Sequence, residues 1–264
     1  MKGDKIMTNC NVFLIGGNVS SDVRLSKNGK FGYFDVAVNR NKTGPAIYIP
    51  VRVFMNDYFK NNLKKGVPIF LQGRFESGSY KSKEDGTTKF YSFLNPVSAQ
   101  HENNAWIGMS ATVDVANVQG NLVTEPEMKQ GNDGKSFVTF RLACNHYSSN
   151  AEKNSEASYL DVIAWDKTAD FISKYFHKGS GIFLSGYLSS RTYKNNNGEN
   201  RTAYSVVATS VEFASWKKKN DDSTAQAAAA PVAATPAPAA PTAPTYGEYG
   251  ADEFDAVEED DLPF

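Results

Sequence analysis

The stretch Phe34-Asp35-Val36-Ala37-Val38-Asn39 occurs a second time in this chain, as Phe140-Arg141-Leu142-Ala143-Cys144-Asn145. Three further stretches repeat in the same order: Tyr48–Phe54 with Tyr159–Trp165, Lys65–Gly73 with Lys178–Gly186, and Ser79–Lys81 with Thr192–Lys194. The matched positions lie 106 to 113 residues apart, which is the length of a small domain and far longer than a solenoid repeat. We therefore predict two copies of one small domain.

Each copy has the pattern of strands with a single helix. In the second copy, the residues 114–121, 136–145, 159–164, 182–188 and 204–213 are rich in Val, Ile, Phe and Tyr and alternate in part with period two. The phenylalanines that stand among aliphatic residues in the repeated strands are assigned to the core: Phe13, Phe34, Phe70, Phe140 and Phe183.

A helix is predicted between the third and fourth strands of each copy. In the second copy Asp166 is the expected N-cap, an apolar stripe runs to Phe176, and Gly179 is the expected stop. In the first copy Asn56 is the expected N-cap and the helix is expected to end near Leu63. Asp85-Gly86 and Asn197-Gly198 are typical of hairpin turns.

Three strands, a helix and two more strands in about 100 residues is the order of an OB-fold, a five-stranded and partly open barrel. We predict an all-β protein with two tandem OB-fold barrels at residues 7–103 and 107–216. Residues 217–264 are rich in Ala and Pro and then in acids. Such a composition has little to bury, so we expect a disordered linker that ends in an acidic tip.

The charges are divided unevenly along the chain. Residues 220–264 hold 10 of the 29 acids and none of the 28 Lys and Arg residues, which leaves residues 1–219 with 28 basic and 19 acidic side chains, a net charge of +9. A positive body predicts a polyanionic partner.

The end of the sequence combines negative charge with an apolar ring. It is Asp260-Asp261-Leu262-Pro263-Phe264. A basic pocket with an apolar slot would bind such a tip, so these five residues are predicted to bind partner proteins. An acidic terminus can also serve solubility alone, but that role does not require Leu262 and Phe264.

Several classes of protein fit the sequence poorly. The three histidines are isolated, no His/Cys/Asp/Glu cluster has metal-ligand spacing, and no glycine-rich phosphate loop is present. We therefore expect no enzyme activity, no metal and no cofactor. No apolar stretch is long enough for a membrane span and no signal peptide is evident, so we expect a cytoplasmic protein. Cys10 and Cys144 are expected to be buried free thiols.

The second copy contains an ordered set of motifs: Asn117–Leu122 with Pro126-Glu127, Phe140–Ala143, Trp165–Ala169, Tyr175–Ser180, Gly186–Leu188 and Arg191–Tyr193 with Asn197-Gly198. With these motifs it resembles the bacterial single-stranded DNA-binding protein (SSB) family over nearly all of its length. The acidic tip resembles the interaction peptide of that family, with Leu262 where Ile is more usual.

The resemblance implies which residues meet DNA. In this family aromatic rings stack on bases and basic side chains hold the phosphates. The positions that match stacking aromatics are Tyr147, Tyr159, Trp165 and Tyr193 in the second copy and Tyr48, Phe54 and Tyr80 in the first. The candidate phosphate contacts are Arg40, Arg52, Arg74, Lys81, Arg141, Lys167, Arg191 and Lys194. The counterpart of Tyr147 falls near Arg40-Asn41, where no ring stands, so the first copy is expected to bind less tightly or differently.

The resemblance also implies the biological setting. We predict sequence-independent binding of single-stranded DNA in replication, recombination and repair, with replication and repair proteins recruited through the tip. The protein is expected to be nucleoid-associated, and two barrels in one chain predict a homodimer. An OB-fold RNA-binding or translation-type factor is the alternative within binding proteins, and a protein-interaction scaffold is a third possibility.

Overall fold

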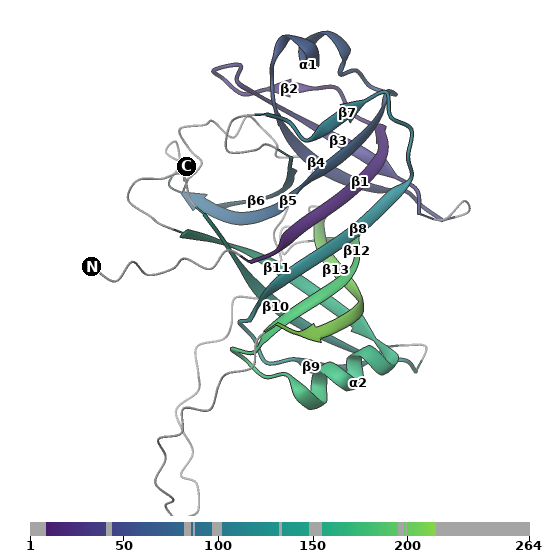
Figure 1. Ribbon diagram of the computed structural model, residues 1–264, viewed down its shortest axis with the longest axis vertical. Coiled ribbons are helices and arrows are strands. Elements are labelled where there is room, and N and C mark those ends of the chain that lie inside the picture. The colour runs from purple at the N-terminus through teal and green to yellow at the C-terminus, as the bar shows by residue number, and fades with distance from the viewer. Residues whose placement is uncertain are drawn as a thin grey trace, which may run out of the picture.

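The computed structural model describes residues 9–40, 44–81, 86, 88–96, 102–131, 134–147, 155–194, 198 and 200–214. The predicted tail and its tip, Asp260 to Phe264, lie outside the described residues. Within the described part the chain forms two halves joined side by side, with one helix at each end (Figure 1).

The first half contains seven strands and one helix. They are β1 (Asn11–Val19), β2 (Arg24–Leu25), β3 (Phe31–Val38), β4 (Ile47–Phe54), α1 (Asp57–Asn62), β5 (Pro68–Lys81), β6 (Thr88–Asn95) and β7 (Ala105–Ile107). The five longer strands pair in the order β1–β3–β4–β6–β5 and return to β1, with a single parallel pair, Val51↔Leu94, between β4 and β6. The short strand β7 pairs with β5, so the sheet of this half extends past residue 103.

The second half repeats this arrangement. It contains β8 (Val113–Leu122), β9 (Glu127–Gln130), β10 (Ser136–Tyr147), β11 (Ser155–Trp165), α2 (Asp166–Tyr175), β12 (Gly181–Lys194) and β13 (Asn200–Phe213). The strands β8, β10, β11, β13 and β12 pair in the same cyclic order, and the strands β11 and β13 are again parallel, here over the four residue pairs from Asp161↔Ser205 to Ala164↔Ala208. The predicted order of three strands, a helix and two strands is therefore present in both halves.

The two halves are joined by a continuous sheet. Strand β1 pairs with β8 in antiparallel register from Asn11↔Val118 to Gly16↔Val113. At the start of β1, the side chain of Asn11 both donates to and accepts from the backbone of Phe75 on β5, at 3.1 Å each. Satisfying these buried polar groups holds the start of β1 on β5.

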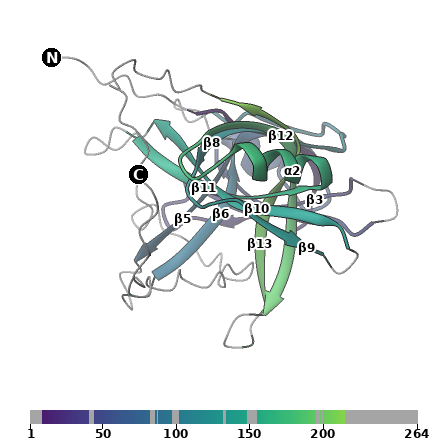
Figure 2. The same cartoon turned by 90° about the horizontal axis from the view of Figure 1, so that it is seen from below.

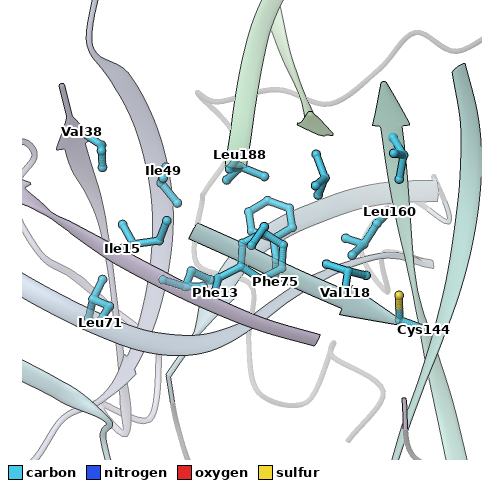
Figure 3. Packing of buried hydrophobic residues seen from close by; sticks show 14 of the residues in the cluster. Phe13, Ile15, Val38, Ile49, Leu71, Phe75, Val118, Cys144, Leu160 and Leu188 are labelled. Carbon is cyan, nitrogen blue, oxygen red and sulfur yellow. The ribbon is translucent and has the colours of Figure 1, made fainter. Parts of the chain in front are cut away.

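A single hydrophobic cluster fills both halves. Alternate residues of the strands, such as Phe13 and Ile15 of β1, point inward and are fully buried. Figure 3 shows that Phe13 and Phe75 lie between the side chains of the first half and those around Val118 and Leu160 of the second, and the two rings lie 5.7 Å apart. The halves therefore share one core, and their relative orientation is fixed by packing as well as by the sheet.

Two of the five predicted core phenylalanines lie elsewhere. Phe13, Phe34 and Phe140 are buried as predicted, whereas Phe70 and Phe183 are only half-buried. Phe70 alternates with the buried Ile69 and Leu71, so it points to the outer face of β5. The prediction was wrong because the aliphatic neighbours of these two rings face the other side of the strand.

The helix ends agree with the sequence in one half only. Asn56 caps α1 as predicted, because its Oδ1 accepts from the Phe59 N–H at 2.9 Å. In the second half the predicted N-cap was wrong: Trp165 is the N-cap, without a side-chain hydrogen bond, and Asp166 is the first helical residue, with φ of 50°. This left-handed conformation is costly for a residue other than glycine, although Asp adopts it more readily than most.

Candidate nucleic-acid interface

The outer face of β10 and β11 carries aromatic and charged side chains. The register Phe137↔Trp165, Arg141↔Asp161 and Ala143↔Tyr159 places all these residues on one face, because directly opposed residues of an antiparallel pair point the same way. The residues between them, among them Val138, are buried in the core. Figure 2 shows the strands that carry this face from below the molecule. We call Phe137, Trp165, Arg141 and Tyr159 the aromatic row.

Trp165 stands at one end of the aromatic row. Its side chain is 39% exposed, and its ring lies 4.9 Å from that of Phe137 at an angle of 37°. The ring is therefore supported on one side by Phe137 while part of its surface faces solvent. Because Asp166 turns the chain directly after Trp165, the indole is held where β11 gives way to α2.

Tyr159 stands further along the same strand and is 42% exposed. The guanidinium of Arg141 lies 5.3 Å from the centre of its ring, and the Arg141 Nε is 3.7 Å from Asp161 Oδ1. Both charged side chains of this pair are partly exposed. A cation held beside an exposed ring is suited to a ligand that offers both a flat face and a negative charge.

Each half braces the corresponding tyrosine of the other half. The Ser77 hydroxyl of β5 donates to the Tyr159 carbonyl, and the Tyr204 hydroxyl of β13 donates to the Tyr48 carbonyl at 3.0 Å. Burial, with the charge of Asp35 as a smaller cause, raises the pKa of Tyr204. Its hydroxyl therefore remains a donor at neutral pH.

Tyr48 is the most exposed of the predicted stacking residues of the first half. It is 56% exposed, whereas Phe54 and Tyr80 are half-buried. In the second half Tyr193 is half-buried on β12, and Tyr147 ends β10. The structure therefore brings Tyr159 and Trp165 onto one surface and leaves Tyr80 and Tyr193 on the long hairpin arms β5–β6 and β12–β13.

The predicted phosphate contacts differ widely in exposure. Four of them have exposed positions on the hairpin arms or at the start of α2: Lys81, Lys167, Arg191 and Lys194. Arg74 is half-exposed and pairs with Glu76 at 3.1 Å. Arg40 reaches into the second half, where its Nε lies 3.4 Å from Asp114 and its guanidinium lies 3.6 Å from the ring centre of Tyr187.

Arg52 is placed where it does not suit contact with a phosphate. The residue is only 4% exposed, and its guanidinium is paired with the buried Glu76 at 3.7 Å. Alternation along β4 would place Arg52 on the outer face with the exposed Tyr48, but Pro50 and Arg52 are buried as well as Ile49, Val51 and Val53, so both faces are buried there. The charge of Arg52 suggested a surface position that its neighbours do not allow.

Phe137 was not among the predicted stacking residues. The sequence repeat could have indicated Phe137, because Phe31 of the first half pairs with Phe54 in the same way as Phe137 pairs with Trp165. The ring centres of Phe31 and Phe54 lie 6.0 Å apart. An aromatic pair that recurs at matched positions was therefore a better guide than either ring alone.

Other kinds of site are not apparent in the part of the chain that the structure describes. No group of three or more His, Cys, Asp or Glu side chains there is arranged to hold a metal ion. Among the same residues no helix is long and apolar enough to cross a membrane. Cys144 is buried, which raises the pKa of its thiol to about 12, and Cys10 is half-buried; both are free thiols.

The protein has two five-stranded units, and exposed rings lie beside cations on their outer strands. A surface of this kind is suited to binding unpaired nucleic acid. Comparison with known proteins gives the family. Residues 114–214 match the model of the single-strand binding protein family. The single-stranded DNA-binding protein of Fusobacterium nucleatum is 39% identical over 102 residues, which are 38% of this chain and 66% of that protein.

A second relative is matched over more of its length. The single-stranded DNA-binding protein 2 of Chlorobaculum tepidum is 33% identical over 108 residues, which are 40% of this chain and 73% of that protein. The chain belongs to the single-strand binding protein family. It spans 65 to 66% of the length of the first curated relatives that it matches.

A solved structure is similar across both halves. The crystal structure of the single-stranded DNA binding protein from Thermus aquaticus matches with a TM-score of 0.56 and 19% identity, over 84% of this chain and 98% of that one. At this identity the likeness supports the fold alone. The predicted fold class, all-β with tandem OB-folds, is confirmed.

Proposed function

We propose that this protein binds single-stranded DNA without regard to sequence. The observation that carries the proposal is the aromatic row, in which Trp165 and Tyr159 are exposed beside Phe137 and Arg141. Every base has a flat face that can stack on such rings, whereas a base inside a duplex is already stacked. The relatives named above are single-stranded DNA-binding proteins, which supports the same conclusion.

In this proposal the side chains have different roles. Trp165 and Tyr159 would stack on bases, at about 1–3 kcal/mol per base. Arg141 and the exposed cations of α2 and the hairpin arms, such as Lys167 and Arg191, would hold the phosphates. The proposed contacts are stacking on bases and pairing with phosphates, so binding alone accounts for the site.

A pair of aromatic variants tests the proposal. Trp165→Ala should weaken binding of a dT oligomer by about 5- to 160-fold, since the stack is lost. Tyr58→Ala is the matched control, because Tyr58 is 53% exposed but lies on α1, at the end of the first half away from the aromatic row (Figure 1). Equal affinity of the Trp165→Ala variant and the unaltered protein would contradict the proposal and favour a protein-interaction scaffold.

The choice between DNA and RNA needs a separate measurement. An rU oligomer offers the same phosphates and base faces as a dT oligomer of equal length. We expect tighter binding of dT in a titration of both oligomers at one salt concentration. A preference for rU would favour the alternative of an RNA-binding factor.

We further propose that the protein acts in replication, recombination and repair, in the cytoplasm and close to the nucleoid. In this proposal the two barrels at 7–103 and 107–216 hold the DNA, and the tip Asp260–Phe264 recruits replication and repair proteins. Deleting the tip should abolish partner binding in a pull-down and leave the affinity for dT intact. A large loss of DNA affinity on this deletion would contradict the division of roles.

A homodimer is proposed for the assembled protein. Support comes from the outer face of the central sheet, where Leu14 and Val115 lie opposite each other in register and Phe70 lies against the exposed Trp106 with ring centres 5.6 Å apart. An apolar face of this kind is suited to burial against a second copy. Light scattering of the full chain should give the mass of a dimer, and a monomer or tetramer would contradict the proposal.

A further inference from the structure

The part of the first half that corresponds to the Phe137 end of the aromatic row is buried. The duplication matches Phe31, Tyr33 and Arg52 with Phe137, Thr139 and Ile163 of the second half. In the second half these three positions are half-exposed. In the first half Phe31, Tyr33 and Arg52 are 8%, 2% and 4% exposed. The two halves therefore have the same fold but not the same free surface.

The side chains of the first half fill this surface themselves. The guanidinium of Arg52 lies 5.0 Å from the ring centre of Phe31 and 4.5 Å from that of Phe93. Phe93, on β6, is fully buried and also packs against Tyr33 with ring centres 6.5 Å apart. A cationic group thus lies within cation–π distance of two aromatic rings and fills the space beside them.

A buried polar network holds Arg52 in this position. Its guanidinium pairs with Glu76, and the other carboxylate oxygen of Glu76 accepts from Arg74 at 3.1 Å and from Asn95 at 2.9 Å. Glu76 and Asn95 are both buried. Moving Arg52 aside would break the ion pair between two buried side chains and leave Glu76 paired with the half-exposed Arg74, which is unfavourable. The filled surface is therefore a stable feature.

The end of β4 is also held by hydrogen bonds to a side chain. The backbone N–H of Phe54 donates to Asn103 Oδ1 at 2.9 Å, and Asn103 Nδ2 donates to the Phe54 carbonyl at 2.7 Å. In the second half β13 continues as one strand from Asn200 to Phe213, whereas the first half has β6 and β7 as separate strands with Asn103 between them. Phe54, the counterpart of the exposed Trp165, is half-buried.

We propose that each chain has one base-stacking platform, the aromatic row of the second half, and that on the β3–β4 face of the first half a bound strand meets a base-stacking ring only at Tyr48. This inference rests on the proposed function. Tyr48 is exposed and is braced by Tyr204 of the second half, so it extends the platform across the junction. Phe31, Tyr33 and Phe54 contribute to folding and do not stack on bases.

Variants at matched positions test this inference in the full chain. Trp165→Ala should weaken binding of a dT oligomer by about 5- to 160-fold, whereas Phe54→Ala should change it by less than about 2-fold. Circular dichroism of each variant verifies the fold. Equal losses in the two folded variants would overturn the inference while leaving single-stranded DNA binding in place.

Photocrosslinking of the unaltered protein gives an answer that needs no variant. A dT oligomer carrying 5-iododeoxyuridine should crosslink to Trp165, Tyr159 and Tyr48. A crosslink to Phe31, Tyr33 or Phe54 would overturn the inference. Absence of any binding of the oligomer would instead contradict the proposed function, so the two failures are distinguishable.

Discussion

Asp114 lies at the junction of the two halves, and its replacement by Asn should change how stability depends on pH. The side chain is fully buried, its Oδ1 accepts from the Leu188 N–H at 2.9 Å, and Arg40 of the first half lies 3.4 Å from its other oxygen. Burial is the largest cause and raises the pKa of Asp114 from 3.8 to about 6, against the opposing effects of that hydrogen bond and of Arg40.

The sign and the size of the pH effect on stability follow from the raised pKa of Asp114. Between pH 3.8 and about 6 the folded chain binds a proton on Asp114 that the unfolded chain has released. The contribution of Asp114 to the free energy of unfolding therefore falls as pH rises through this window. A shift of about two units corresponds to a change of about 3 kcal/mol, which is an upper value.

Urea unfolding at pH 4 and pH 7.5 measures this contribution. Asp114→Asn keeps an acceptor for Leu188 but does not titrate, and all other groups are common to both proteins. The free energy of unfolding of the variant relative to the unaltered protein should therefore rise by up to about 3 kcal/mol from pH 4 to pH 7.5. A constant difference, or one that falls with pH, would refute this explanation of the junction.

Three further predictions concern the strained turn at Asp166, the irregularity of register between Ser185 and Gly186 in β12, and the phosphate contacts. Asp166→Gly should raise the free energy of unfolding by up to about 1 kcal/mol, because the left-handed conformation at φ 50° is costly for L-residues; a loss of stability in urea unfolding would show that the Asp side chain matters more. Gly186→Ala should lower it by about 1–3 kcal/mol, because a Cβ there would overlap the Val207 carbonyl oxygen; a melting temperature equal to that of the unaltered protein would count against this. Lys167→Ala should make the log–log salt dependence of dT affinity shallower by about 0.7, the value for one phosphate; an unchanged slope would remove Lys167 from the phosphate contacts.

The duplication made much of the fold predictable. Strands that recur at matched positions, and an N-cap such as Asn56, are local signals that the tertiary structure leaves in place. Phe70 and Phe183 were misassigned because composition does not tell which face of a strand a residue occupies.

The exposure of the candidate site residues was predictable in the second half and less so in the first. Tyr159 and Trp165 were identified from the family pattern, and the structure places both on one exposed face. Arg52 was misplaced because its burial depends on Glu76 and Phe93, which are distant in sequence. Whether a repeated surface is open or filled is decided by such long-range contacts, so the sequence repeat alone could not reveal it.

Fluorescence from single tryptophans tests most directly whether Trp165 stacks on bases. A variant with Trp106→Phe and Trp216→Phe retains Trp165 alone, and a Trp165→Phe variant retains the other two. Titrated with poly(dT) at low and at high salt, the first variant should lose most of its emission and the second should lose little. Equal quenching of the two variants would contradict the proposal that the aromatic row binds DNA.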